Sequence, residues 1–166
     1  AGVILDANNG QIIASVSLPD FDPHLTKRGR AEALFNRASL GVYEMGSTFK
    51  AFTVAMALEY GTADIGDSFD ARRPLRIAQF MIRDNHAKDR WLSVPEVFIY
   101  SSNIGAARMA LEVGAERQKN FLKRLGLFDR APVEVSEVGE PILPTFWRKS
   151  TIMTVAYGHG IAVAPI

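Results

Sequence analysis

Residues 47–58 read STFKAFTVAMAL, a stretch with the composition of a helix in which Lys50 is the only charged residue. A helix that is apolar on every side is a buried one. This stretch constrains the fold more than any other feature of the chain, because other segments must cover the helix from both sides. The sequence therefore predicts a central buried helix over residues 47–60 that ends at Gly61.

Ser47 and Lys50 stand at the start of this helix with i, i+3 spacing, which places their side chains on one face. Burial disfavours the ammonium form of a lysine and lowers its pKa, and a helix N-terminus favours negative charge. A serine beside an amine of lowered pKa is an activated nucleophile. The alternative interpretation of a Ser-x-x-Lys match is a helix N-cap serine with a lysine whose amine reaches solvent.

A second polar group lies at Ser101 and Asn103, between two predicted helices. Ser93 and Glu96 form a capping box that begins a helix running to about Tyr100, and residues 104–113 form the next helix. We therefore expect Ser101 and Asn103 on a short connection from which their side chains can reach a cleft. The alternative is local capping of the two helices.

The other segments complete an α+β pattern. Two β-rich runs over residues 3–5 and 12–17 are joined through Asn9-Gly10, a strong hairpin signal. Alternating apolar residues within 72–84 predict a small hairpin or irregular ribbon. Residues 31–35, 115–125 and 149–156 are predicted to be helical, and residues 19–30 and 131–144 are predicted to be loops.

Several function classes are disfavoured. The net charge of +1 argues against a dedicated nucleic-acid binder. His24, His86 and His159 have no second ligand at metal spacing, and Gly158-x-Gly160 lacks the strand–helix context of a dinucleotide site, so no cofactor is predicted. The segment 84–86 is interpreted as a turn. The chain has no cysteine, which excludes disulfides and thiolate chemistry, and no apolar run approaches the roughly 18 residues of a membrane span.

The two motifs, in this order, resemble those of the active-site serine penicillin-recognising enzymes, which carry Ser-x-x-Lys, then Ser-x-Asn, then Lys-Thr-Gly. The flanking sequence is similar to the class B penicillin-binding proteins, the monofunctional D,D-transpeptidases. The similar segments are residues 1–6, 9–10, 21–23, 36–38, 43–50, 157–160 and 163–165. Among class B enzymes, residues 50–59 look most like the septal, division-specific transpeptidase.

The resemblance implies a reaction and a setting. Ser47 would attack the penultimate carbonyl of a peptidoglycan stem peptide ending in D-Ala-D-Ala, and a neighbouring strand's amine would then take the acyl group. Lys50 would be the base, Ser101 would relay a proton to the leaving amine, and Asn103 would hold Lys50 and the substrate amide. β-Lactams would acylate Ser47. The resemblance also implies cell-division membrane proteins as partners and the periplasmic face of the bacterial inner membrane as location, with the anchor helix outside this chain.

The chain departs from the family at the third motif, because no Lys-Thr-Gly or Lys-Ser-Gly occurs and residues 149–151 lack the glycine. We therefore expect residues 1–166 to be a partial transpeptidase domain that lacks the C-terminal strands and the third motif, and to be inactive alone. Of a five-stranded antiparallel sheet only the N-terminal hairpin would be present. Part of the helix over residues 47–60 and one hairpin edge should then be exposed.

Two alternatives to a transpeptidase stay open at this point. One is a β-lactamase or D,D-carboxypeptidase, which needs an efficient water-activating group. The other is a non-catalytic penicillin-binding sensor or divisome interaction module, which could retain Ser47 and Lys50 without turnover.

Overall fold

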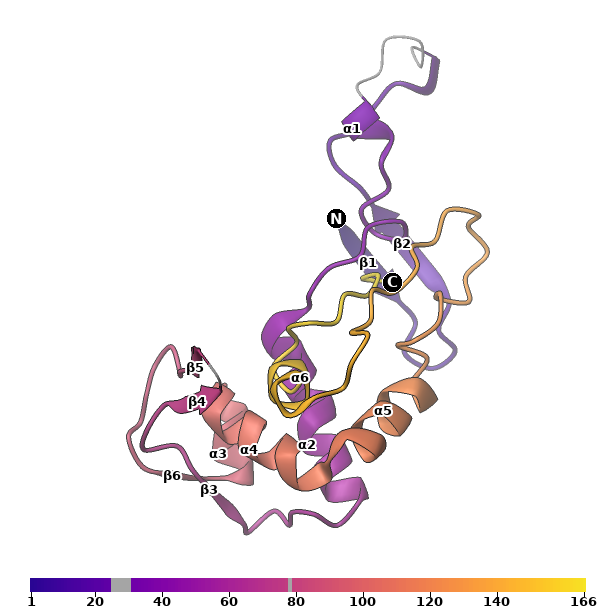
Figure 1. The fold of residues 1–166 in the computed structure, drawn as a ribbon. Helices are drawn as coiled ribbons and strands as arrows, with labels where there is room; N and C mark the ends of the chain where they lie inside the picture. Colours follow the sequence, from indigo (N-terminus) through magenta and orange to yellow (C-terminus); the bar gives the residue numbers. More distant parts are fainter. Residues whose placement is uncertain (25–30, 78) are drawn as a thin grey trace. The chain divides into compact units, whose positions relative to one another are not determined.

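The computed structural model describes residues 1–24, 31–77 and 79–166, so part of the loop predicted over residues 19–30 lies outside the described residues (Figure 1). Two compact units make up the chain. The first comprises residues 1–43, 126–142 and 162–166, and the second comprises residues 44–125 and 143–161. Helices and small antiparallel strand pairs occur together, which confirms the predicted α+β class.

The first unit contains the predicted N-terminal hairpin. Strands β1 (Gly2–Leu5) and β2 (Ile12–Val16) pair antiparallel, with a bulge between Ile4 and Leu5. Gly10 in the connecting loop has a φ of +76°, a left-handed conformation that glycine adopts without strain. Ile4 and Ile13 are 59% and 68% exposed. The hairpin therefore presents open apolar surface, as expected for a partial sheet.

The rest of the first unit is held by short backbone contacts. Helix α1 (Ala31–Leu34) is the predicted helical turn. Two isolated bridges pair Tyr43 with Val163 and Ile142 with Ala162. Apart from the bridge at Ile142, residues 131–144 form no strand or helix, in agreement with the predicted loop.

The second unit is mostly helical. A 3₁₀ turn, η2 (Gly46–Phe49), leads directly into α2 (Lys50–Glu59). The other helices are α3 (Val94–Ile99), α4 (Asn103–Val113), α5 (Ala115–Arg124) and α6 (Lys149–Val155). The predicted capping box is present at α3, where the Ser93 hydroxyl accepts from the Glu96 backbone and the Glu96 carboxylate accepts from the Ser93 backbone.

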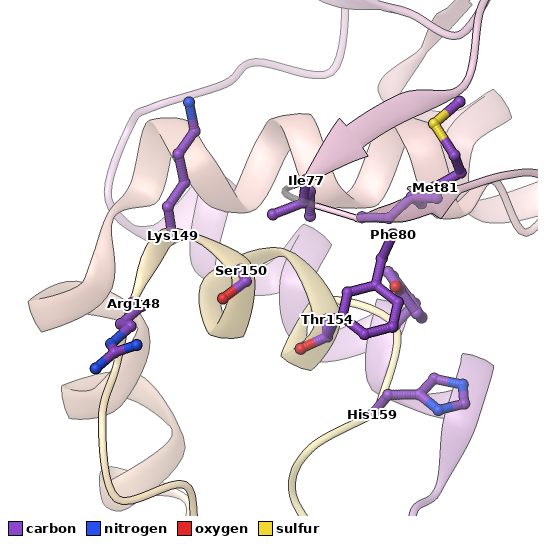
Figure 2. Close-up of a pocket in the computed structure, with 10 residues that line it drawn as sticks. Ile77, Phe80, Met81, Arg148, Lys149, Ser150, Thr154 and His159 are labelled. Atoms are coloured by element: carbon purple, nitrogen blue, oxygen red, sulfur yellow. The ribbon is translucent and has the colours of Figure 1, made fainter.

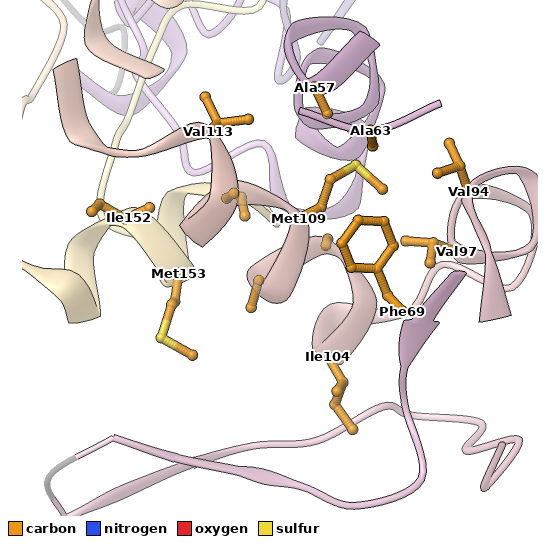
Figure 3. Close-up of a cluster of buried hydrophobic side chains, with 14 of the residues drawn as sticks. Ala57, Ala63, Phe69, Val94, Val97, Ile104, Met109, Val113, Ile152 and Met153 are labelled. Carbon is orange, nitrogen blue, oxygen red and sulfur yellow. The ribbon is translucent and has the colours of Figure 1, made fainter. Parts of the chain in front are cut away.

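Helix α4 lies at the centre of the core. Its alanines at positions 106, 107 and 110 are at most 1% exposed and let neighbouring backbones approach closely. Figure 3 shows the ring of Phe69 beside Met109 of α4 and Val97 of α3. Burying one such large apolar side chain stabilises the fold by about 1.5–3 kcal/mol. The core therefore fixes the α3–α4 junction, where Ser101 lies.

Helix α2 is buried on one face only. Lys50, Thr53 and Met56 face the interior, whereas Ala51 and Leu58 on the opposite side are exposed. The expectation that part of this helix would be exposed in this chain is therefore confirmed. The exposed side is apolar, so the described residues leave uncovered the surface that the sequence pattern marks for burial.

Two further strand pairs flank the helices. Strands β4 (Leu75–Ile77) and β5 (Phe80–Ile82) form the hairpin predicted within residues 72–84. Strands β3 (Ser68–Asp70) and β6 (Trp91–Ser93) pair antiparallel and were not predicted. Each contributes one buried apolar residue, Phe69 and Leu92, which is too little for a period-two pattern to be visible in the sequence.

Side-chain hydrogen bonds fix α6 within the second unit. The buried Thr53 hydroxyl donates to the Ala156 carbonyl at 2.8 Å. The amide of Gln118, also buried, donates to the Ile152 carbonyl at 3.1 Å. These bonds tie α6 to α2 and α5. Among the described residues, no helix combines the length and the apolar character needed to span a bilayer.

Candidate active site

Ser47 and Lys50 are brought together by the start of α2. Ser47 lies in the exposed 3₁₀ turn, and Lys50, which begins α2, is only 1% exposed. The Lys50 amine, Nζ, lies 3.0 Å from the Ser47 hydroxyl oxygen, Oγ. Gly46 has a φ of +57°, so the chain turns into the helix immediately before Ser47. The lysine amine is therefore turned inward to the serine and not outward to solvent.

Ser101 reaches the same amine from the α3–α4 junction. Lys50 Nζ lies 2.8 Å from Ser101 Oγ and 2.7 Å from the Ser101 carbonyl oxygen. Ser101 thus presents two acceptors to one amine. The predicted convergence of the two motifs is observed: one buried amine lies within hydrogen-bond reach of both serine hydroxyls.

The backbone of Ser101 explains how it makes both contacts. The Ser102 N–H donates to the Val97 carbonyl and the Ser101 N–H donates to the Phe98 carbonyl, which is the Schellman ending of a helix. This motif places Ser101 in the left-handed region, with a φ of +54°. A non-glycine residue there costs about 1 kcal/mol. Such strain is common at functional sites, and here it directs the carbonyl and the hydroxyl toward Lys50.

The electrostatics of Lys50 follow from its burial. Loss of hydration lowers its pKa from 10.5 to about 8, and the nearby carboxylate of Asp84 opposes that shift. A neutral amine has two N–H donors and one lone pair. It can therefore donate to the two Ser101 oxygens and accept the proton of the Ser47 hydroxyl.

Asp84 is a site residue that the sequence interpretation missed. Its carboxylate accepts from the Ser102 hydroxyl at 2.7 Å and from the Ile104 backbone N–H at 2.9 Å. The Ser102 hydroxyl in turn accepts from the Gly105 N–H and caps α4. Asp84 thus fixes the loop that carries Ser101. The turn predicted for residues 84–86 is present at Asn85 and His86, but nothing in the sequence connects Asp84 to a serine so distant along the chain.

Asn103 lies beside the two serines with a different partner from the one expected. It is the first residue of α4, not a loop residue, and its side-chain amide donates to the Arg83 carbonyl at 2.9 Å. Asn103 therefore links α4 to the segment that carries Asp84. Its role toward Lys50 and a substrate amide stays a prediction.

A glycine-rich turn closes another side of the site. The Glu44 carboxylate accepts from the Gly160 N–H at 2.6 Å and lies 3.1 Å from His159 Nδ1. Gly158 packs so closely on the backbone of Gly46 that a Cβ atom there would overlap the Gly46 oxygen and nitrogen. Segment 157–160 is therefore fixed against the residues that immediately precede Ser47.

These segments enclose a cavity of about 410 Å³, called the catalytic cavity below. It is lined by Gly46, Ser47, Asn85, His86, Tyr100, Ser101, Asn103, Tyr157 and His159. Three of the four residues predicted from the sequence line it directly, and Lys50 lies behind the two serines. The cavity thus exposes the Ser47 hydroxyl, while the Lys50 amine beside it is shielded from water.

The Gly158 contact gives a testable expectation. Gly158→Ala should lower the thermal unfolding temperature more than Gly160→Ala in the complete protein that contains this chain. Both glycines have φ near +80°, so both substitutions carry a backbone penalty of about 1 kcal/mol. Only Gly158→Ala adds a clash with the Gly46 backbone. A Cβ atom at Gly160 would lie 3.5 Å from the Thr154 hydroxyl oxygen, which is an ordinary van der Waals contact. Overpacking of this kind costs about 1–3 kcal/mol. Equal unfolding temperatures would contradict the close approach.

Several proteins of similar sequence are named as peptidoglycan D,D-transpeptidases. The chain is 39% identical over 165 residues to the probable peptidoglycan D,D-transpeptidase FtsI of Caulobacter vibrioides. It is 30% identical over 164 residues to the probable peptidoglycan D,D-transpeptidase PenA of Neisseria gonorrhoeae, and 28% identical over 168 residues to the peptidoglycan D,D-transpeptidase FtsI of Escherichia coli K12. These matches cover 98–100% of this chain and 28% of each relative.

Solved structures agree with this similarity. A crystal structure of a peptidoglycan glycosyltransferase from Burkholderia ambifaria superposes with a TM-score of 0.82 at 27% identity, over 98% of this chain and 48% of that one. The apo transpeptidase domain of Burkholderia pseudomallei penicillin-binding protein 3 gives a TM-score of 0.73 at 29% identity, over 78% of this chain and 40% of that one. The family model described as the penicillin binding protein transpeptidase domain matches residues 1–166. The chain belongs to the penicillin-binding protein transpeptidase family and has the fold of its transpeptidase domains.

Proposed function

We propose that the complete protein containing this chain is a serine D,D-transpeptidase that cross-links peptidoglycan stem peptides and is acylated by β-lactams. The observation that carries the proposal is the position of the Lys50 amine, buried and within 3.0 Å of both serine hydroxyls. This is the arrangement that acyl transfer through a serine requires, with a nucleophile, its base and a second hydroxyl in one hydrogen-bonded group.

In the first half of the proposed reaction, Ser47 Oγ attacks the penultimate carbonyl of a peptide ending in D-Ala-D-Ala. The neutral Lys50 amine takes the hydroxyl proton. With a pKa of about 8, roughly a tenth of the lysine is neutral at pH 7, which is an appropriate range for a general base. The Ser101 hydroxyl relays a proton to the departing amine of the terminal D-alanine, and Asn103 orients the substrate amide.

In the second half, the amine of a neighbouring strand attacks the acyl-Ser47 ester. A C–N bond forms, the Ser47 Oγ–C bond breaks, and the amine's proton returns through Ser101 and Lys50 to Ser47. The oxyanion is stabilised by the Ser47 backbone N–H and, by analogy with the family, by a second N–H from the strand that carries the Lys-Thr-Gly motif.

The setting of the reaction is part of the proposal. The chain spans 28% of the curated relatives, so we infer that residues 1–166 form part of a transpeptidase domain whose third motif lies in another segment. By the same resemblance, we place the protein on the periplasmic face of the inner membrane, in septal wall synthesis, with other cell-division membrane proteins as partners.

The test measures whether the acyl-enzyme reacts with an amine, reacts with water or persists. The complete protein is incubated with a peptide ending in D-Ala-D-Ala, with and without an amine acceptor, and mass spectrometry quantifies the cross-linked peptide, the hydrolysed peptide and the acyl-enzyme. A transpeptidase gives mainly cross-linked product when the acceptor is present. Hydrolysis that the acceptor does not suppress would show a carboxypeptidase or β-lactamase instead, and a stable acyl-enzyme without turnover would show a sensor.

A further inference from the structure

The second half of the proposed reaction involves one proton more than the route through Ser101 and Lys50 takes up. An alkyl amine such as a lysine side chain is an ammonium ion at neutral pH, because its pKa is about 10.4. An ammonium nitrogen has no lone pair, so it has to lose a proton before it can attack the acyl-Ser47 carbonyl. The route through Ser101 and Lys50 takes up a different proton, which leaves the nitrogen when the C–N bond forms. A second base at the catalytic cavity would remove the first proton where the amine reacts.

His159 lies in the turn that follows α6 and lines the catalytic cavity together with Ser47. It also lines a second cavity of about 580 Å³ between α6 and the β4–β5 hairpin. Figure 2 shows the His159 ring pointing away from Ser150 and Thr154 of α6. The ring centroid lies 5.2 Å from that of Tyr157, and the His159 side chain is 55% exposed. The imidazole is therefore packed on one side and open to water on another.

Glu44 orients this imidazole. Its carboxylate lies 3.1 Å from His159 Nδ1 and is itself held by the Gly160 N–H, which donates to it at 2.6 Å. A carboxylate acceptor favours the imidazole tautomer that carries its hydrogen on Nδ1. Nε2 then has a lone pair with which it can take up a proton. The carboxylate would also stabilise the imidazolium that forms, as the carboxylate of a catalytic triad does.

His86 is the other histidine that lines the catalytic cavity. In the part of the chain that the structure describes, no ion pair to a carboxylate involves His86, so no carboxylate selects its tautomer or stabilises its charged form. Imidazole is the side chain that exchanges a proton most readily near neutral pH. Of the two histidines, His159 has the oriented and charge-stabilised imidazole that suits a general base.

We propose that His159 is the general base that deprotonates the acceptor amine, and that Glu44 is its positioning residue. The inference rests on the proposed function, because it concerns the second half of that reaction. His159 Nε2 takes one proton from R–NH₃⁺ and leaves R–NH₂, whose nitrogen attacks the acyl-Ser47 carbonyl. The C–N bond forms and the Ser47 Oγ–C bond breaks. One N–H proton then returns through Ser101 and Lys50 to Ser47 Oγ. The His159 imidazolium releases its proton to water.

The test compares two acceptors that differ in the protonation state of the attacking nitrogen. At pH 7 the side-chain amine of Nα-acetyl-lysine is almost entirely an ammonium ion, whereas hydroxylamine is mainly neutral and needs no base before it attacks. Each acceptor is offered to the complete protein together with a peptide ending in D-Ala-D-Ala, and mass spectrometry measures the amide or hydroxamate product. Rates are expressed per molecule that a fluorescent penicillin labels at saturation, so unfolded protein does not enter the comparison.

His159→Gln should lower the rate with Nα-acetyl-lysine about 100-fold more than the rate with hydroxylamine, within the range for loss of a general base. Glu44→Gln keeps an oxygen for the Gly160 N–H but lacks the charge, so it should show the same selective loss to a smaller degree. The matched control is His86→Gln, which removes the other cavity imidazole and should show no selectivity between the acceptors.

Equal losses with the two acceptors in His159→Gln would show that His159 acts only through the shape of the site, and would overturn the assignment. An unchanged rate with Nα-acetyl-lysine would overturn it as well. A wild-type protein that uses neither acceptor would overturn the proposed function, and the general base with it.

Discussion

Ser47→Ala is expected to abolish covalent labelling of the complete protein by a fluorescent penicillin. The Ser47 hydroxyl is exposed, lies 3.0 Å from the Lys50 amine and lines the catalytic cavity. Removing a serine nucleophile commonly costs about 10⁶-fold in turnover, so labelling should fall below detection. Gel fluorescence measures the labelling, and mass spectrometry of the wild-type adduct should place it on Ser47.

Ser68→Ala is the matched control, because Ser68 is exposed on β3 and does not line the catalytic cavity. It should label like the wild-type protein. An adduct on another serine, or undiminished labelling of Ser47→Ala, would show that the nucleophile has been assigned to the wrong residue.

Lys50→Met should reduce the acylation rate by about 10³-fold, within the range for loss of a general base. Methionine keeps the apolar stem and removes the amine. In the wild-type protein the rate should rise with pH around a midpoint near 8, because the neutral amine is the active form and its pKa is lowered to about 8. Lys50→Met should show no such rise. Lys123→Met, on the exposed surface of α5, should leave both rate and midpoint unchanged.

Asp84→Asn tests whether the Asp84 carboxylate raises the pKa of Lys50. The Asp84 carboxylate favours the charged form of Lys50, so removing its charge should lower the pKa of Lys50 and move the midpoint to lower pH. The asparagine oxygen can still accept from the Ile104 N–H. Asp129→Asn, outside the second unit, is the control. A midpoint that stays in place, or rises, would mean that the titrating group is not Lys50.

The sequence is most informative about contacts between residues that are close together along the chain. Ser47 and Lys50 are three residues apart on one helix, so their contact follows from helical spacing alone. The capping box of Ser93 and Glu96 is likewise a local signal. Ser101 was connected to this pair through the order of the motifs in a known family, because the sequence alone gives no distance between the two segments.

The remaining features depend on tertiary packing, which the sequence does not display. The β3–β6 pair joins three-residue strands that are distant along the chain and leave no periodic pattern. Asp84 looked like a turn residue, since its partners are the Ser102 hydroxyl and the Ile104 backbone N–H. An apolar pattern shows which residues of α2 require cover, but it does not show whether the same segment of chain supplies that cover.

The left-handed backbone of Ser101 bears on which residues can occupy that position. Glycine would form the same helix ending without the steric penalty and would keep the carbonyl that contacts Lys50. It would lose only the hydroxyl that lies 2.8 Å from the amine. Glycine at this position should therefore give a more stable turn than serine does. The turn therefore depends only on the backbone of Ser101, whereas the proton relay that we propose depends on its hydroxyl.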